Sequence, residues 1–184
     1  YDDEIVAAQK MQEFAKKSPA QTIPFLNDRQ QILKIIGINK LNLLGEINIQ
    51  NIIPAVIIGR LYKVSEQNIL KAIANFQPLP HRLEFIGEFK GIKFYNDSLS
   101  TIPQATLGAL QALGKDVETL IAGGFDRGLD YSILGQAIAN SHIKTLILFP
   151  DTGVKIWDSV CKYSKKLPKK FDVDDMGKAV KIVY

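Results

Sequence analysis

Two short segments carry most of the side chains that could do chemistry. Residues 96–101 read Asn-Asp-Ser-Leu-Ser-Thr and place an amide, a carboxylate and three hydroxyls directly before a helix-like run. Residues 123–128 read Gly-Gly-Phe-Asp-Arg-Gly and place a guanidinium beside glycines that let a ligand approach the backbone. Arginine can hold a carboxylate through two hydrogen bonds, and the backbone N–H groups at a helix start favour an anion. The two segments therefore indicate a site for anionic ligands.

Each of these residues also has an ordinary structural role open to it. Asp97 and Ser98 could close a turn, and Ser100 or Thr101 could cap the helix that follows. The two glycines could form a plain strand-to-loop turn, and Arg127 could be a surface charge. The residue types alone leave both interpretations open, so they support a polar, anion-friendly rim and nothing more specific.

Several other chemistries are not indicated. The Gly123-Gly124 spacing differs from the Gly-x-Gly-x-x-Gly fingerprint of nicotinamide cofactors, and the chain contains no phosphate-binding P-loop motif. The single cysteine, Cys161, excludes an internal disulfide, and with only His81 and His142 besides it we expect no zinc centre. The spacing suggests no Ser-His-Asp or Cys-His arrangement, so both histidines are interpreted as structural.

The composition is that of an ordinary globular protein. The 184 residues are 46% hydrophobic and 23% charged, which is enough apolar material for a sizeable core. Lys and Arg outnumber Asp and Glu by 23 to 19, and we interpret the lysine-rich stretch at 162–170 as a solvated loop or helix end rather than a nucleic-acid site. The longest apolar run, 52–58, is far too short to span a membrane, so we expect no membrane insertion. The single cysteine leads us to expect a reducing cytosol.

The chain divides into two parts with different patterns. In residues 1–80 we expect a helix at 2–17, strand-like pieces at 23–26, 32–36 and 41–43, and a helical run through Tyr62 that begins or kinks at Pro54. Ser65 is a good N-cap for a further helix, and Pro78 and Pro80 mark the domain boundary.

After residue 81 strands and helices alternate. The pair Lys90-Gly91 predicts the turn of a β-hairpin with strands at 83–89 and 92–96. Beyond it we expect strands at 117–122, 145–149 and 170–173, and helices at 103–113, 131–140, 154–163 and from 174 onward. This alternation predicts an α/β, Rossmann-like domain with a parallel sheet and helices on both faces. Because ligands bind beyond the carboxyl ends of parallel strands, we expect both polar segments at that edge.

Four motifs occur in the order and approximate spacing found in the Mur ligases. They are Gly45-x-x-Asn48-x-x-Asn51, His81-Arg82-Leu83-Glu84, Asn96-Asp97-Ser98-x-x-Thr101, and Gly123-Gly124-x-Asp126-Arg127 with Asp130. The second and third motifs resemble those of the branch of the family that adds D-glutamate. The resemblance covers nearly the whole chain.

This resemblance implies a C-terminal fragment of a three-domain enzyme. Residues 1–80 would be the second half of the central, P-loop ATPase-type α/β domain. Residues 81–184 would be the Rossmann-like C-terminal domain, incomplete at its C-terminus. The P-loop and the magnesium ligands would lie upstream, so we expect no metal site within this chain and no activity from the chain alone.

The implied activity is ATP- and Mg²⁺-dependent formation of an amide bond between D-glutamate and UDP-N-acetylmuramoyl-L-alanine, through an acyl phosphate, in peptidoglycan synthesis. We expect a cytoplasmic monomer that works on small molecules and has no nucleic-acid partner. Two alternatives stay open. One is another amino-acid or folylpolyglutamate-type ligase of the same superfamily, and the other is a non-catalytic Rossmann-type binding domain.

The resemblance also implies residue roles, position by position. The residues matched to the nucleotide side are Asn48, Asn51, Arg82, Asn96 and Asp97. Those matched to D-glutamate are Thr101, Arg127 and Ser98, and no residue is assigned as catalytic. The chain departs from the common pattern at a few positions: Ile47 replaces a histidine, Arg127 a lysine, and Leu99, Ser100 and Ile102 replace lysine, alanine and asparagine.

Overall fold

The computed structural model describes residue 34 and residues 43–184, which fall into two compact units. One contains Ile49–Phe76, and the other joins Leu43–Asn48 to Gln77–Tyr184. The helix expected at 2–17 and the strand pieces expected at 23–26 and 41–43 lie outside the described residues, apart from Leu43, which has no regular structure.

The strand predicted at 32–36 is wrong at the one position that can be compared, because Lys34 lies in a helix. The apolar residues on either side of Lys34 recur at a spacing that suits one face of a helix as well as a buried strand. A short apolar run of this kind does not distinguish the two structures.

The first unit is built around two helices. Helix α3 (Glu46–Leu61) starts well before Pro54, so the proline lies inside the helix rather than at its beginning. Helix α4 (Glu66–Asn75) begins after Ser65, whose hydroxyl accepts the Asn68 N–H at 3.3 Å. This hydrogen bond confirms the predicted N-cap.

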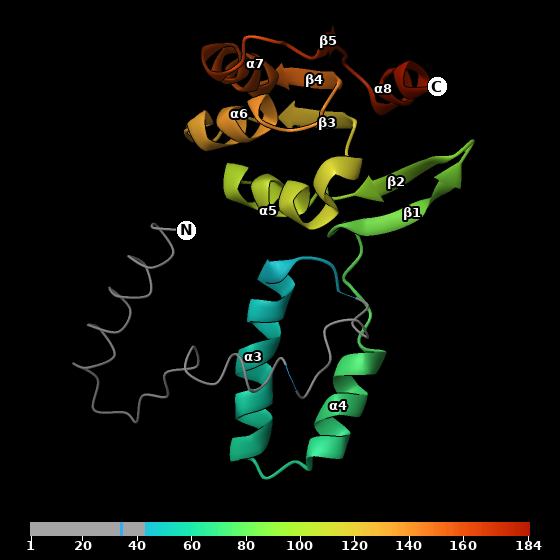
Figure 1. Ribbon diagram of the computed structural model, residues 1–184, viewed down its shortest axis with the longest axis vertical. Coiled ribbons are helices and arrows are strands. Elements are labelled where there is room, and N and C mark those ends of the chain that lie inside the picture. Colours follow the sequence, from blue (N-terminus) through green and yellow to red (C-terminus); the bar gives the residue numbers. More distant parts are fainter. Residues whose placement is uncertain (1–33, 35–42) are drawn as a thin grey trace, which may run out of the picture. The chain divides into compact units, whose positions relative to one another are not determined.

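The second unit contains a three-stranded parallel sheet and the helices around it (Figure 1). The strands, in their order across the sheet, are β3 (Thr119–Gly124), β4 (Thr145–Asp151) and β5 (Lys169–Asp172). The helices are α5 (Pro103–Leu113), followed by a short 3₁₀ turn (Gly114–Asp116), α6 (Ser132–Ala139), α7 (Thr152–Tyr163) and α8 (Met176–Val183). The predicted α/β class with a parallel sheet is therefore confirmed.

Helices cover both faces of this sheet. On one face, Leu148 of β4 is buried against Leu134 of α6 and Val160 of α7. On the other face, Ile147 of β4 is buried with Ala179 of α8. Successive residues of a strand point to opposite faces, so neighbouring apolar residues of β4 reach two different helical layers. The predicted layout with helices on both faces is confirmed.

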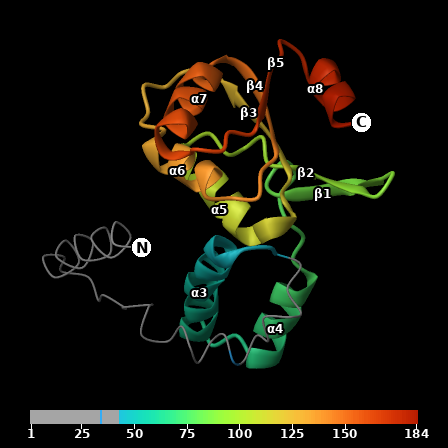
Figure 2. The same ribbon diagram turned by 45° about the horizontal axis from the view of Figure 1, so that its top comes forward.

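Strands β1 (Glu84–Phe89) and β2 (Ile92–Asn96) form an antiparallel hairpin that extends away from the parallel strands (Figure 2). Lys90 and Gly91 both have positive φ, at +54° and +78°, as the tight turn between two twisted strands requires. The hairpin is a sheet of its own, so the expectation that residues 96–101 follow a strand of the parallel sheet is wrong. The expectation fails because β2 pairs with β1 along one edge, and among the described residues no strand of the parallel sheet pairs with its other edge.

Candidate functional site

A hollow in the second unit collects residues from four segments: the start of α3, the turn before β1, the segment after β2, and α5. Its walls are Leu44, Asn48, Arg82, Leu83, Asp97, Ser100, Ala105, Gly108 and Ala109. Three residues that were predicted to bind the nucleotide therefore meet here, namely Asn48, Arg82 and Asp97. Their guanidinium, amide and carboxylate are the kinds of donors and acceptors that suit a ligand with phosphates and hydroxyl groups.

Gly45 brings the start of α3 close to α5. Its φ is +88°, and a Cβ at this position would come within 2.8 Å of the Ala112 Cβ. Asn48 lies on the first turn of α3 and donates from Nδ2 to the Leu44 carbonyl at 2.7 Å. The absence of a side chain at Gly45 thus permits the approach that puts Asn48 on the wall of the hollow. Asn51 is further along the same helix, is exposed and is not part of this wall.

Arg82 lies between two residues with left-handed backbone. His81 has a φ of +64° and Leu83 a φ of +47°, a conformation that costs residues other than glycine roughly 1 kcal/mol or more each. Two carboxylates hold this turn. Glu84 Oε2 accepts the His81 N–H at 2.7 Å, and Asp97 Oδ1 accepts the Leu83 N–H at 2.9 Å. The strain is therefore offset by contacts on both sides of Arg82.

Asp97 joins this turn to the segment after β2. While Oδ1 accepts from Leu83, Oδ2 accepts from the Ser100 hydroxyl, and the Asp97 carbonyl accepts the Ser100 N–H at 2.9 Å. The Leu99 N–H adds a second connection between the two segments, because it donates to the His81 carbonyl at 3.1 Å. Both oxygens of the carboxylate are thus engaged by the protein on the wall of the hollow.

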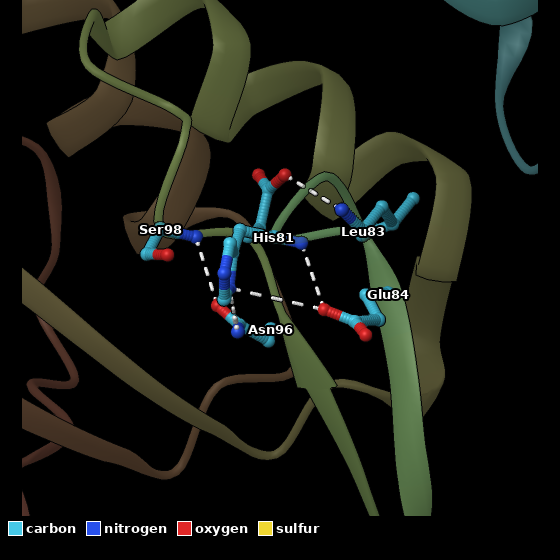
Figure 3. Close-up of polar contacts among 6 residues, drawn as sticks. His81, Leu83, Glu84, Asn96 and Ser98 are labelled. Atoms are coloured by element: carbon cyan, nitrogen blue, oxygen red, sulfur yellow. Dashed lines mark hydrogen bonds and ion pairs between the residues drawn. The ribbon is translucent and has the colours of Figure 1, made fainter. Parts of the chain in front are cut away.

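Asn96 and His81 form a further contact between the same two segments (Figure 3). Asn96 Oδ1 accepts the Ser98 N–H at 3.1 Å. The amide nitrogen Nδ2 of the same side chain lies 2.7 Å from His81 Nδ1. Because an amide nitrogen donates, His81 Nδ1 acts as the acceptor in this arrangement. Glu84 Oε2 lies 3.8 Å from the same ring nitrogen. The side chain of Ser98 is exposed.

Sequence reasoning did not assign His81, Glu84 or Ser100 to the site. The first two belong to one of the matched motifs, which was the only signal that they lie near it. Ser100 carried no signal beyond being a hydroxyl next to a helix start, where capping is the usual role. Its bond to Asp97 depends on how the turn after β2 folds.

The helix after this segment is capped differently from the prediction. The N-cap residue of α5 is Ile102, which makes no side-chain cap bond, and Pro103 lies in the first turn. The prediction that Ser100 or Thr101 caps this helix is therefore wrong. The Ser100 hydroxyl bonds to Asp97 instead, and a proline at the start of a helix has no N–H that needs an acceptor. Thr101 is exposed.

The glycine-rich segment begins at the end of β3, at the carboxyl edge of the parallel sheet as predicted. A Cβ at Gly123 would lie 2.7 Å from the Phe149 carbonyl oxygen, so only glycine allows β3 to run this close to β4. Asp126 accepts the Gly128 N–H at 2.9 Å and pairs with the Lys155 ammonium of α7. The Lys155 hydrogen bond, and after it the Gly128 amide, holds the pKa of Asp126 below its ordinary value.

Arg127 is presented by this segment but is not part of the hollow. Its side chain is exposed, and no hydrogen bond or ion pair joins it to another residue in the described part of the chain. The neighbouring Phe125 is 81% exposed. The structure thus gathers Asn48, Arg82 and Asp97 on one hollow, and it leaves Arg127 on a separate, solvent-facing loop.

The described residues offer neither a metal centre nor a membrane helix. Within residues 34 and 43–184, no three or more His, Cys, Asp or Glu side chains are grouped closely enough to hold a metal ion. Over the same residues, none of the helices combines the length and the apolar character that crossing a bilayer requires.

The chain is similar to a set of curated ligases, although no protein-family model matches it. It is 37% identical over 151 residues to the UDP-N-acetylmuramoylalanine–D-glutamate ligase of Thermoanaerobacter sp. strain X514, which covers 82% of this chain and 33% of that protein. The ligase of the same name from Enterococcus hirae is 34% identical over 82% of this chain and 35% of its own length. The ligase of that name from Natranaerobius thermophilus is 32% identical, over 93% of this chain and 38% of its own length.

Solved structures of Mur ligases share the fold. The UDP-N-acetylmuramate–alanine ligase MurC from Thermotoga maritima matches 78% of this chain and 33% of its own, with a TM-score of 0.61 and 16% identity. MurF from Acinetobacter baumannii matches 76% of this chain and 30% of its own, with a TM-score of 0.58 and 20% identity. The fold is therefore the one found in the Mur ligases.

Within that class, the sequence similarity identifies the branch. The chain belongs to the family of the UDP-N-acetylmuramoylalanine–D-glutamate ligases. It spans about one third of the length of the curated relatives that it matches.

Proposed function

We propose that the protein carrying this chain is an ATP-dependent ligase that joins D-glutamate to UDP-N-acetylmuramoyl-L-alanine in peptidoglycan synthesis. The observation that carries the proposal is the joint placement of Asn48, Arg82 and Asp97 on one hollow, in a chain 37% identical to a ligase of that name. We further propose that residues 1–80 belong to the central ATPase domain and residues 81–184 to the C-terminal domain.

The proposed reaction proceeds through an activated carboxylate. A carboxylate reacts poorly with amines because its leaving group would be oxide. Transfer of the terminal phosphoryl group of ATP to the alanyl carboxylate gives an acyl phosphate. The amine of D-glutamate attacks its carbonyl carbon, and the tetrahedral intermediate expels phosphate and forms the amide. Such a reaction needs mainly the alignment of anions and the neutralisation of their charge.

The nucleotide side is proposed to consist of Asn48, Asn51, Arg82, Asn96 and Asp97. Arg82 is suited to phosphate oxygens because its guanidinium presents several donors in a planar fork. The turn that carries it is held by Glu84 and Asp97, which limits the entropy that the arginine loses when it binds an anion.

The D-glutamate side is proposed to consist of Thr101, Arg127 and Ser98. Arg127 supports this role because it is exposed on a loop at the carboxyl edge of the parallel sheet, where ligands commonly bind. The ion pair of Asp126 with Lys155 fixes the residue next to it. Leu99 carries no charge, and Arg127 is the one cationic residue of segments 96–101 and 123–128.

Magnesium is proposed to be held outside this chain. The described residues lack a suitable group of ligands, so none of the steps above is assigned to a magnesium ligand of this chain. The protein is further proposed to be a cytoplasmic monomer that acts on small molecules.

The proposed function is tested by phosphate release from the full-length protein with ATP, Mg²⁺ and UDP-N-acetylmuramoyl-L-alanine. D-glutamate, L-glutamate, L-alanine and L-lysine are added in turn. We expect release with D-glutamate alone. Release with a different amino acid would indicate another ligase of the superfamily, and no release with any of them, from a folded protein, would leave a binding domain without ligase activity.

A further inference from the structure

We propose that Ser100 is a positioning residue for Arg82 and that it acts through Asp97. The Ser100 hydroxyl donates to Asp97 Oδ2, and Asp97 Oδ1 accepts the Leu83 N–H at 2.9 Å. A carboxylate that is bonded at both oxygens has a single orientation. The Ser100 hydroxyl thus makes one of the two hydrogen bonds that hold the other oxygen toward Leu83.

The hydrogen bond of the Leu83 N–H matters because the backbone on both sides of Arg82 is strained. Leu83 has a φ of +47° and His81 a φ of +64°, so the turn is strained on both sides of the arginine. The His81 side is held by Glu84 and by the Leu99 N–H, whereas the hydrogen bond to Asp97 holds the Leu83 side. When that bond is lost, Leu83 relaxes toward an ordinary φ, and the peptide that carries Arg82 turns with it.

The position of Ser100 fits this role. Its side chain is partly buried on the wall of the same hollow as Arg82 and Asp97, where an alanine would leave Asp97 Oδ2 without its protein donor. The proposal rests on the proposed function only for the identity of the ligand that Arg82 meets.

The test compares Ser100→Ala and Ser100→Thr in the full-length protein with Ser164→Ala as the matched control. Ser164 also makes one hydroxyl hydrogen bond, to the Lys166 carbonyl at 2.8 Å, in the turn after α7. Two quantities are measured. The first is hydrogen–deuterium exchange at the Leu83 amide, read by mass spectrometry with fragmentation. The second is the Kd of the non-hydrolysable ATP analogue adenylyl imidodiphosphate with Mg²⁺, by calorimetry.

We expect Ser100→Ala to speed exchange of the Leu83 amide and to raise the Kd, each about tenfold, which is the effect of losing one hydrogen bond to a charged group. Ser100→Thr retains the hydroxyl and should restore both quantities, and Ser164→Ala should change neither. Unchanged Leu83 exchange in Ser100→Ala would overturn the proposal, and so would faster exchange with an unchanged Kd. If the wild-type protein bound no analogue, the proposed function would fail, and Leu83 exchange would still decide whether Ser100 holds the turn.

Discussion

The backbone N–H of Leu83 donates to Asp97 Oδ1 at 2.9 Å, although the two residues are fourteen positions apart in the chain. This bond joins the His-Arg-Leu-Glu and Asn-Asp-Ser motifs, which the sequence presents as separate segments. It puts Arg82 and Asp97 on one hollow together with Asn48. The proposed nucleotide site therefore depends on the hairpin β1–β2, because antiparallel pairing places the end of β2 beside the start of β1.

Replacing Asp97 by asparagine should weaken the use of ATP. Asp97→Asn keeps the size of the side chain but removes the negative charge that accepts from Leu83 and Ser100. Hydrogen bonds to charged groups contribute about 1.5–3 kcal/mol, so the KM for ATP should rise at least about tenfold. Steady-state kinetics of the full-length protein measure this. Wild-type ATP kinetics in the variant would remove Asp97 from the nucleotide site.

Removing the guanidinium of Arg127 should affect a different substrate. Arg127→Ala should raise the KM for D-glutamate about tenfold or more, because a charge-assisted contact to a carboxylate is lost, while the KM for ATP stays unchanged. Arg127→Lys keeps the charge and serves as the matched variant, with a smaller increase expected. If the KM for D-glutamate were the same in Arg127→Ala and wild type, the arginine would have no part in binding the amino acid.

The two glycines after β3 should respond unequally to alanine. Gly123 and Gly124 have φ angles of +123° and +124°, so φ is unfavourable for alanine to a similar extent in both variants. Only at Gly123 does a Cβ meet other atoms, the closest being the Phe149 carbonyl oxygen at 2.7 Å, whereas nothing lies within 4 Å at Gly124. Gly123→Ala should therefore lower the free energy of unfolding by about 1–3 kcal/mol more than Gly124→Ala, measured by urea denaturation. Equal losses would mean that β3 and β4 are not this close.

The ion pair of Asp126 with Lys155 should make the loop that carries Arg127 sensitive to acid. The folded-state pKa of Asp126 lies below its ordinary value, mainly because of the Lys155 hydrogen bond. A carboxyl of this kind stabilises the fold above its unfolded pKa, and this contribution disappears as the pH falls through the folded pKa. Lys155→Met should move the Asp126 pKa upward, toward the ordinary value, in a carbon-13 NMR titration. A midpoint that did not move would show that Lys155 does not hold Asp126 in solution.

Local sequence signals predicted much of the fold. The pair Lys90-Gly91 located the hairpin because a two-residue turn needs two residues that adopt positive φ, and Ser65 located the start of α4 through its cap. Each strand and helix from β1 onward begins within two residues of its predicted start. These features depend on neighbouring residues alone.

The details that sequence reasoning missed depend on distant residues. Ser100 looked like a helix cap, and its bond to Asp97 is decided by a turn that also receives the Leu83 N–H from another segment. The sequence predicts the parallel sheet, but it does not show that β1 and β2 form a separate sheet. Residues 96–101 therefore do not lie at the edge of the parallel sheet. Of the residues that the motifs suggest for the nucleotide, Asn48, Arg82 and Asp97 line the hollow, and this grouping depends on the fold.

The acyl-phosphate step is tested most directly with an oxygen-18 label. UDP-N-acetylmuramoyl-L-alanine labelled with oxygen-18 in the alanyl carboxylate is incubated with the full-length protein, ATP, Mg²⁺ and D-glutamate. The released phosphate is then analysed by mass spectrometry. An acyl phosphate requires that one carboxylate oxygen leaves with the phosphate, so we predict one oxygen-18 per phosphate and one amide product for each phosphate. Unlabelled phosphate would mean that ATP is hydrolysed by water, and it would contradict the proposed ligase mechanism.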